Sequence, residues 1–277
     1  MIPLTVVQGY STALSQLSVA ALATLRDLLA SVADESPEMQ RAVLVEAFPE
    51  VFNPYAAASA AVSASFFEEV RDLVGVGGQF AAQTLDIVEA PKWSSLVGWG
   101  TQGSMFERGG QALIFALLSG GLQRVLTEHA ADTIIGNAAM DESAVWGYQR
   151  VPSPGCCAFC GLLASRGAVY DSEESAGAVV GRGKPVGSHK LAKGIRSRGA
   201  RALGEGFHDS CRCTIVPVNA GNHVQMQEDA DKYLEAYAAA RNKVSDDRRA
   251  EGYNGFGDQA TSTRMILAEM RQSLGVK

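Results

Sequence analysis

Cysteine and histidine residues form the pattern in this chain that is richest in potential chemistry. Cys157-Ala-Phe-Cys160 is a C-x2-C pair, and His208-Asp-Ser-Cys211-Arg-Cys213 is an H-x2-C-x-C group. Two tight turns that each direct two such side chains inward commonly hold a tetrahedral Zn²⁺, which replaces part of the core that a small domain lacks. The spacing therefore predicts a zinc site in this part of the chain.

Five potential ligands for four positions leave the ligand set open. We favour Cys157, Cys160, His208 and Cys211, with Cys213 packed behind the site or taking the place of His208. Alternation along a strand puts Cys211 and Cys213 on the same side, so it does not decide between them. Since every ligand would come from the protein, the pattern indicates a closed structural site and not a catalytic one.

Two other roles for the thiols stay open. They could be buried or redox-active thiols without a metal, since free cysteine packs as a small hydrophobic residue. Cys156, which we place outside the ligand set, could instead be a nucleophile with His208 as its base. The number of cysteines is odd and all five lie between Cys156 and Cys213. Together with an N-terminus that lacks a secretory signal, this predicts a reducing cytoplasm and no disulfide scaffold.

A basic segment, residues 181–201, separates the two ligand groups. It is rich in glycine and holds seven basic and no acidic residues, although the chain has 24 Lys and Arg against 30 Asp and Glu and a net charge of −6. We expect it to contact the phosphate backbone of double-stranded DNA, with a solvated loop or docking on an acidic protein surface as alternatives. Its glycines do not form a P-loop. The basic residues are Arg182, Lys184, Lys190, Lys193, Arg196, Arg198 and Arg201.

Helices are expected to dominate the first half of the chain. Apolar residues at spacings of three and four predict them, and Ser36-Pro37 and Asn53-Pro54 are typical of helix starts. The predicted helices cover residues 4–33, 37–49, 54–74, 79–89, 103–119 and 121–141.

Strands are expected on both sides of the cysteine segment, at residues 146–151 and 214–218. Helices over 225–249 and 260–273 complete the chain. The predicted fold is mainly α with a small α+β domain. The predicted domains are a helical N-terminal domain (1–123), a Cys/His domain with the basic loop (124–223) and a helical tail (224–277).

Membrane insertion is not expected. The most apolar run, residues 112–118, is far shorter than the roughly 20 residues that cross a bilayer. The apolar stripe of the first helix is close to heptad spacing, so self-association through this helix is an open expectation.

Residues 151–170 and 207–218 resemble the C-terminal domain of phage Mu F-like minor head proteins, with similarity over about 124–218. The closest likeness is to the actinobacteriophage version encoded next to the portal. Its C-x2-C and H-x2-C-x-C groups match the family, although Asp209 stands where many members have proline. The resemblance implies a virion protein inside the head near the portal, made in the host cytoplasm, with portal and capsid partners. Its role would be in head assembly and in DNA packaging or ejection.

Proteins of this kind are also labelled capsid maturation proteases, which is the alternative function. His129 and Asp132 lie three apart on a predicted helix, but the chain has no G-x-S-x-G nucleophile turn. We interpret this pair as a solvated or capping interaction and assign no catalytic residue.

Overall fold

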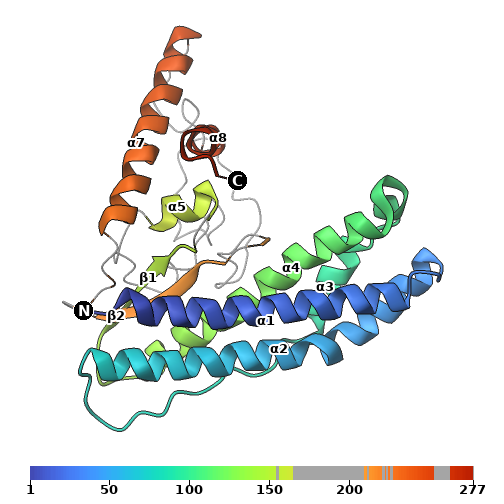
Figure 1. Ribbon diagram of the computed structural model, residues 1–277, viewed down its shortest axis with the longest axis horizontal. Coiled ribbons are helices and arrows are strands. Elements are labelled where there is room, and N and C mark those ends of the chain that lie inside the picture. Colours follow the sequence, from blue (N-terminus) through green and yellow to red (C-terminus); the bar gives the residue numbers. More distant parts are fainter. Residues whose placement is uncertain are drawn as a thin grey trace, which may run out of the picture.

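The structure, a computed structural model, describes residues 1–153, 156–164, 209–210, 212–219, 222, 224, 227–252 and 263–276. It has a long helical body with a smaller part at one end, where the chain begins (Figure 1). The body contains α1 (Leu4–Ser31), α2 (Pro37–Leu73), α3 (Ala90–Gly100) and α4 (Gly103–Met140). The smaller part contains β1 (Trp146–Val151), α5 (Ala158–Ala164), β2 (Thr214–Asn219), α7 (Gln227–Ala250) and α8 (Thr263–Leu274). The predicted mainly α fold with a small α+β part is confirmed.

Helix α1 packs against α2 and α4 through an apolar inner side. Ala21 and Leu25 are fully buried there, and the Tyr10 ring stacks on Phe66 with 4.0 Å between the ring centroids. The Tyr10 hydroxyl also lies 2.7 Å from the Ser63 hydroxyl. Within the described residues, α1 is the one helix long and apolar enough to cross a membrane by length and composition. Its inner side, however, forms part of the core of a folded bundle.

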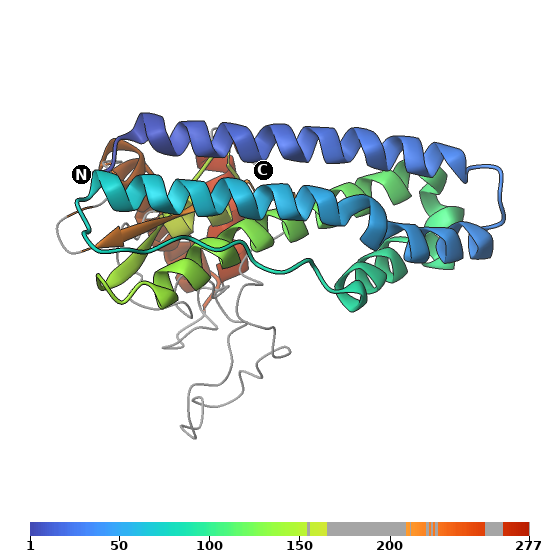
Figure 2. The same ribbon diagram turned by 90° about the horizontal axis from the view of Figure 1, so that it is seen from below.

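Helix α2 begins as the sequence predicted but does not stop where expected. Ser36 accepts a hydrogen bond from the Met39 N–H at 3.3 Å, with Pro37 at the first helical position. The predicted break near Asn53-Pro54 is wrong, since one bent helix includes both Pro49 and Pro54 (Figures 1 and 2). The Asn53 side chain accepts a hydrogen bond from the Trp93 indole at 3.0 Å, so it joins α2 to α3.

The predicted helix over 79–89 is also wrong, because this stretch is extended. It runs along the helical body (Figure 2). Side chains of α2 and α4 bind its backbone. Asn137 of α4 accepts from the Gln83 N–H at 2.7 Å and donates to its carbonyl at 2.8 Å. Glu68 of α2 accepts from the Ala82 N–H at 2.9 Å. These bonds satisfy backbone groups that a helix would have paired internally.

Helix α4 continues through the predicted break at Gly120-Gly121 and departs from helical geometry at Gly110 instead, where φ is +55°. The glycine pair serves close packing. A Cβ atom at Gly121 would overlap a methyl group of Leu96, so the glycine lets α3 pack closely against α4. The predicted domain boundary at residues 123/124 lies inside this helix and stays a prediction.

Strands β1 and β2 form an antiparallel pair with Trp146 opposite Asn219 and Val151 opposite Thr214. Ile215 and Val216 are almost completely buried in the same cluster as residues of α1, α2 and α4. Near the N-terminus, Ile2 makes an isolated parallel bridge with Val224, which follows β2 and lies outside the two-stranded sheet. The strands predicted at 146–151 and 214–218 are therefore confirmed, the second one residue longer.

A buried ion pair joins the helical body to β1. The Arg71 Nε donates to the Asp141 carboxylate at 2.7 Å, and both side chains are almost completely buried. The Ser143 N–H and the Trp146 indole also donate to Asp141, at 3.1 Å each. Burial alone would raise the pKa of Asp141, but the bonds from Arg71, Ser143 and Trp146 outweigh it and lower that pKa.

Asp141→Asn should therefore lower the free energy of unfolding at pH 7 by about 3 kcal/mol, since it leaves the buried Arg71 uncompensated. A carboxyl with a lowered pKa stabilises the fold above its ordinary pKa of 3.8 and loses that contribution as the pH falls through its folded value. Urea unfolding should show a deficit that shrinks below pH 4. Asp72→Asn, at an exposed position, is the control. A deficit that does not change with pH would contradict this role of Asp141.

Candidate functional site

The two cysteine-bearing arms leave the same end of the β1–β2 pair. One arm follows Val151 and the other precedes Thr214, and these two residues are opposite each other in the register. Cys160 and Cys213 are both buried in the hydrophobic cluster that contains the sheet, with Cys157 packed against it. Three of the five predicted zinc ligands thus lie in one cluster. His208 and Cys211 are outside the described residues.

The local geometry of the C-x2-C pair suits a thiolate. Cys157 directly precedes α5, and the Cys160 N–H donates to the Cys157 sulfur at 3.5 Å. Donors of this kind at the start of a helix favour the charged form of a thiol, which is the form that binds a metal. Among the described residues alone, no three Cys, His, Asp or Glu side chains are arranged to hold a metal. The zinc site therefore stays a prediction.

Cys156 contributes to the packing of α7. Its thiol donates to the Tyr233 hydroxyl at 3.2 Å. The Tyr233 ring contacts Gly161 of α5, where a Cβ atom would be 2.5 Å from Cδ1 of the ring. Cys156 was predicted to lie outside the ligand set. Its contact with a helix more than 70 residues away could not be predicted from the sequence.

The turn that follows His208 is fixed to α4. The Ser210 N–H donates to the Gly120 carbonyl at 3.0 Å, and the Arg124 guanidinium pairs with Asp209 at 2.9 Å. Ser210 has a left-handed φ of +64°, which turns the chain at this point. A Cβ atom at Gly120 would lie 3.1 Å from that of Asp209, so the glycine allows the turn to approach the helix closely.

A buried carboxylate stands behind this turn. Glu128 is fully buried and pairs with Lys92 at 3.1 Å and with Arg124 at 3.3 Å, so Arg124 bridges Glu128 and Asp209. Burial outweighs the attraction of the two cations and raises the pKa of Glu128. Burial lowers the pKa of Arg124, but Glu128 and Asp209 overcome this and raise it overall. The network joins α3, α4 and the second cysteine arm.

The expectation that His129 is solvated is wrong. This side chain is 6% exposed, and its Nε2 has no hydrogen-bond partner in the described structure. Burial, followed by the charge of Lys92, lowers the pKa of the His129 imidazole. This environment therefore favours the neutral form of the His129 imidazole.

The predicted nucleic-acid contacts, Arg182, Lys184, Lys190, Lys193, Arg196, Arg198 and Arg201, all lie outside the described residues. Arg212 is exposed and was not among the functional residues predicted from the sequence. Its place between two predicted ligands, Cys211 and Cys213, was the signal that could have found it, because side chains alternate along an extended chain.

The chain was compared with models of known protein families. A family model described as VG15 protein matches residues 1–240. The chain belongs to this family. VG15 is a family of viral gene proteins, which makes this a phage protein. The VG15 match covers the helical body, the β1–β2 pair and both cysteine arms, and ends within α7. No curated protein and no solved structure matches the chain.

The contact between Gly161 and Tyr233 predicts that Gly161→Ala destabilises this VG15 protein. The added methyl group must displace the half-buried Tyr233 ring, at a cost of about 1–3 kcal/mol measured by thermal or urea unfolding. In a Tyr233→Leu background the same substitution should cost clearly less.

Gly136→Ala is the matched control, because its Cβ atom would be 3.7 Å from the nearest neighbour, an ordinary contact. It should be neutral or stabilising by about 0.5–1 kcal/mol, since alanine favours a helix over glycine. An equal cost of Gly161→Ala with Tyr233 and with Leu at position 233 would refute the proposed clash.

Proposed function

We propose that this phage protein is a minor head protein that is attached near the portal inside the head. It acts in head assembly and in DNA packaging or ejection, with portal and capsid proteins as partners. The VG15 match supports a viral role. The resemblance of residues 151–170 and 207–218 to Mu F-like minor head proteins supports the more specific assignment.

The anchoring of the two cysteine arms carries the proposal. The first arm ends with α5 at Ala164, and the second is fixed to α4 through Asp209 and Ser210. The register of Val151 opposite Thr214 holds both arms at one end of the body. The basic segment 181–201 belongs to the chain between these two anchors. We therefore expect the basic segment to contact DNA and the long body to dock on protein.

The charge distribution supports the same division. Seven of the 24 Lys and Arg lie in the basic segment, whereas none of the 30 Asp and Glu does. Acidic character elsewhere keeps the body from binding DNA indiscriminately, because like charges repel. Phosphate contacts made by such a segment position DNA without reading its sequence.

Replacing Arg196, Arg198 and Arg201 by Gln should weaken binding to duplex DNA and flatten its dependence on salt. Each lost phosphate contact should reduce the slope of log K against log salt by about 0.9. The control is Lys232→Gln, Arg241→Gln and Arg271→Gln, which removes the same charge from exposed helix positions. A slope that is equal in the two triple variants would contradict DNA binding by the segment.

Phage carrying the Arg196, Arg198 and Arg201 variant tests the role in the particle. Heads should assemble with normally processed capsid protein but package or eject less DNA. Accumulation of uncleaved head precursors, repaired by the wild-type protein supplied in trans, would instead support the capsid maturation protease and overturn the structural role.

The proposed zinc would be held by Cys157, Cys160 and two of His208, Cys211 and Cys213, and would tie the two arms together. Purified reduced protein should contain about one equivalent of zinc. Cys157→Ser should lose it and unfold the arms, whereas Cys156→Ser should retain it, since Cys156 bonds to Tyr233. Less than about 0.2 equivalents in the wild-type protein would contradict the site.

A further inference from the structure

The outer side of α2 and the extended stretch 79–89 carry an unbalanced negative charge. From Ala42 to Pro91 the chain holds seven acidic residues and one basic residue. The basic residue, Arg71, is buried and paired with Asp141, so it adds no charge to the surface. The acidic residues are all exposed; they are Glu46, Glu50, Glu68, Glu69, Asp72, Asp86 and Glu89.

An open groove of about 510 Å³ lies between α2 and the extended stretch. Ile87 of the stretch lines it and is 64% exposed. The next residue, Val88, is buried in the core of the helical body, so the position of Ile87 beside α2 is fixed. The lining from α2 consists of Pro49, Glu50, Asn53, Pro54 and Ala57.

The groove combines apolar surface with hydrogen-bond acceptors. Glu50 lines it, and Asp86 directly precedes Ile87 in the chain. Glu46 lies one helical turn before Glu50 and so on the same side of α2. Because Pro54 has no N–H, the Glu50 carbonyl also lacks the hydrogen bond that residue i+4 of a helix normally donates. Lys and Arg fit such a surface, since they pair with carboxylates and pack apolar stems on apolar side chains.

We propose that this groove binds a basic segment of a partner protein. An apolar side chain of the segment packs on Ile87 and Pro54, and the Lys or Arg residues on either side of it pair with Glu50 and Asp86. The proposal goes beyond the proposed function, which does not say where on the body a partner binds or what its chemistry is. It rests on the groove and its charges alone.

Charge and geometry favour a basic protein segment over other occupants. The carboxylates repel DNA and anionic lipid headgroups, and two copies of a chain with a net charge of −6 also repel each other. Within the described residues, no three Cys, His, Asp or Glu side chains are arranged to hold a metal ion. Lys92, which follows the stretch in the chain, is paired with Glu128 at 3.1 Å and leaves the negative charge of the groove in place.

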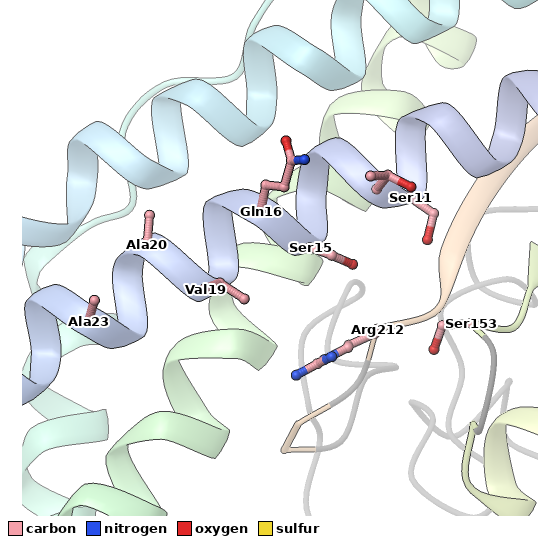
Figure 3. Close-up of a pocket in the computed structure, with 9 residues that line it drawn as sticks. Ser11, Ser15, Gln16, Val19, Ala20, Ala23, Ser153 and Arg212 are labelled. Carbon is pink, nitrogen blue, oxygen red and sulfur yellow. The ribbon is translucent and has the colours of Figure 1, made fainter.

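Another open groove, along α1, lacks this complementarity. Its lining includes Ser15 and Val19 of α1 and Arg212 of the second cysteine arm, which extends beside the helix (Figure 3). None of the described residues that line it is acidic, so it has no carboxylate to pair with a cation. Self-association through α1 stays a prediction. Val19 is 61% exposed, close to the value for Ile87, so the α1 groove provides a matched control.

Binding is tested with the full-length reduced protein and two short synthetic peptides, measured by fluorescence anisotropy. The peptides share a leucine centre and differ only in having lysine or glutamine on both sides of it. The lysine peptide should bind at least about tenfold more tightly, and less so at high salt, because exposed charges are screened. The double variant Glu50→Lys/Asp86→Lys should weaken its binding at least about tenfold, and Ile87→Ser by about tenfold.

Asp27→Lys, at an exposed position of α1, and Val19→Ser are the controls and should leave the affinity unchanged. Equal losses in the groove variants and the controls would show unspecific attraction and overturn the proposal. A lysine peptide that binds no more tightly than the glutamine peptide also overturns it. If the double variant does not fold by circular dichroism, Glu50→Gln/Asp86→Asn provides the same test, since it removes both charges without reversing them.

The partner itself is tested in phage-infected cells with a photo-cross-linking amino acid in place of Ile87. The cross-linked peptide should come from another protein and carry Lys or Arg on both sides of an apolar residue, and Glu50→Lys should abolish the cross-link. A cross-link to nucleic acid, to this chain or to a peptide without basic residues overturns the proposal, as does the absence of any cross-link. A basic partner that is not a head protein would contradict the proposed head function and leave the assignment of the groove intact.

Discussion

The antiparallel pairing of β1 with β2 is the contact on which the smaller part of the molecule depends. It joins chain segments separated by about 60 residues, and closing a loop of that length costs roughly 4 kcal/mol or more in chain entropy. Burial of Ile215 and Val216 in the hydrophobic cluster that the sheet shares with the helical body offsets a cost of this size, at about 1.5–3 kcal/mol for each large side chain. The sheet is stable because the body covers it. A two-stranded sheet alone would be marginal in water.

The body can provide this support because three of its helices pass through two separate cores. α1, α2 and α4 contribute to a cluster around Trp93 and Leu122 and to a second cluster around Phe67 and the sheet. Because the same long helices pack in both clusters, they fix the position of one cluster relative to the other. The ion pair of Arg71 with Asp141 and the bridge of Arg124 between Glu128 and Asp209 add directional contacts at the junction. Directional contacts define register more strictly than apolar packing does.

Glycine has a specific role at this junction. Gly120 allows the Asp209–Ser210 turn to reach α4, and Gly161 receives the Tyr233 ring. Both positions bring the cysteine arms and α7 close to elements that are far away in the sequence. Such close contacts hold the cysteine arms and α7 in a fixed position relative to the helical body.

The sequence alone determined the features that depend on neighbouring residues. Ser36-Pro37 starts α2 because a hydroxyl acceptor and a fixed φ act locally, and the flanks of the cysteine segment are strands because alternating residues favour them. Both cysteine groups could be identified from the spacing of their residues in the sequence. The tertiary structure decided whether residues that commonly end a helix do so in this chain. Asn53 bonds to Trp93 instead of capping a helix, Gly120 allows the Asp209–Ser210 turn to contact α4, and His129 is buried. Such outcomes depend on partners distant in the chain, which local propensity does not contain.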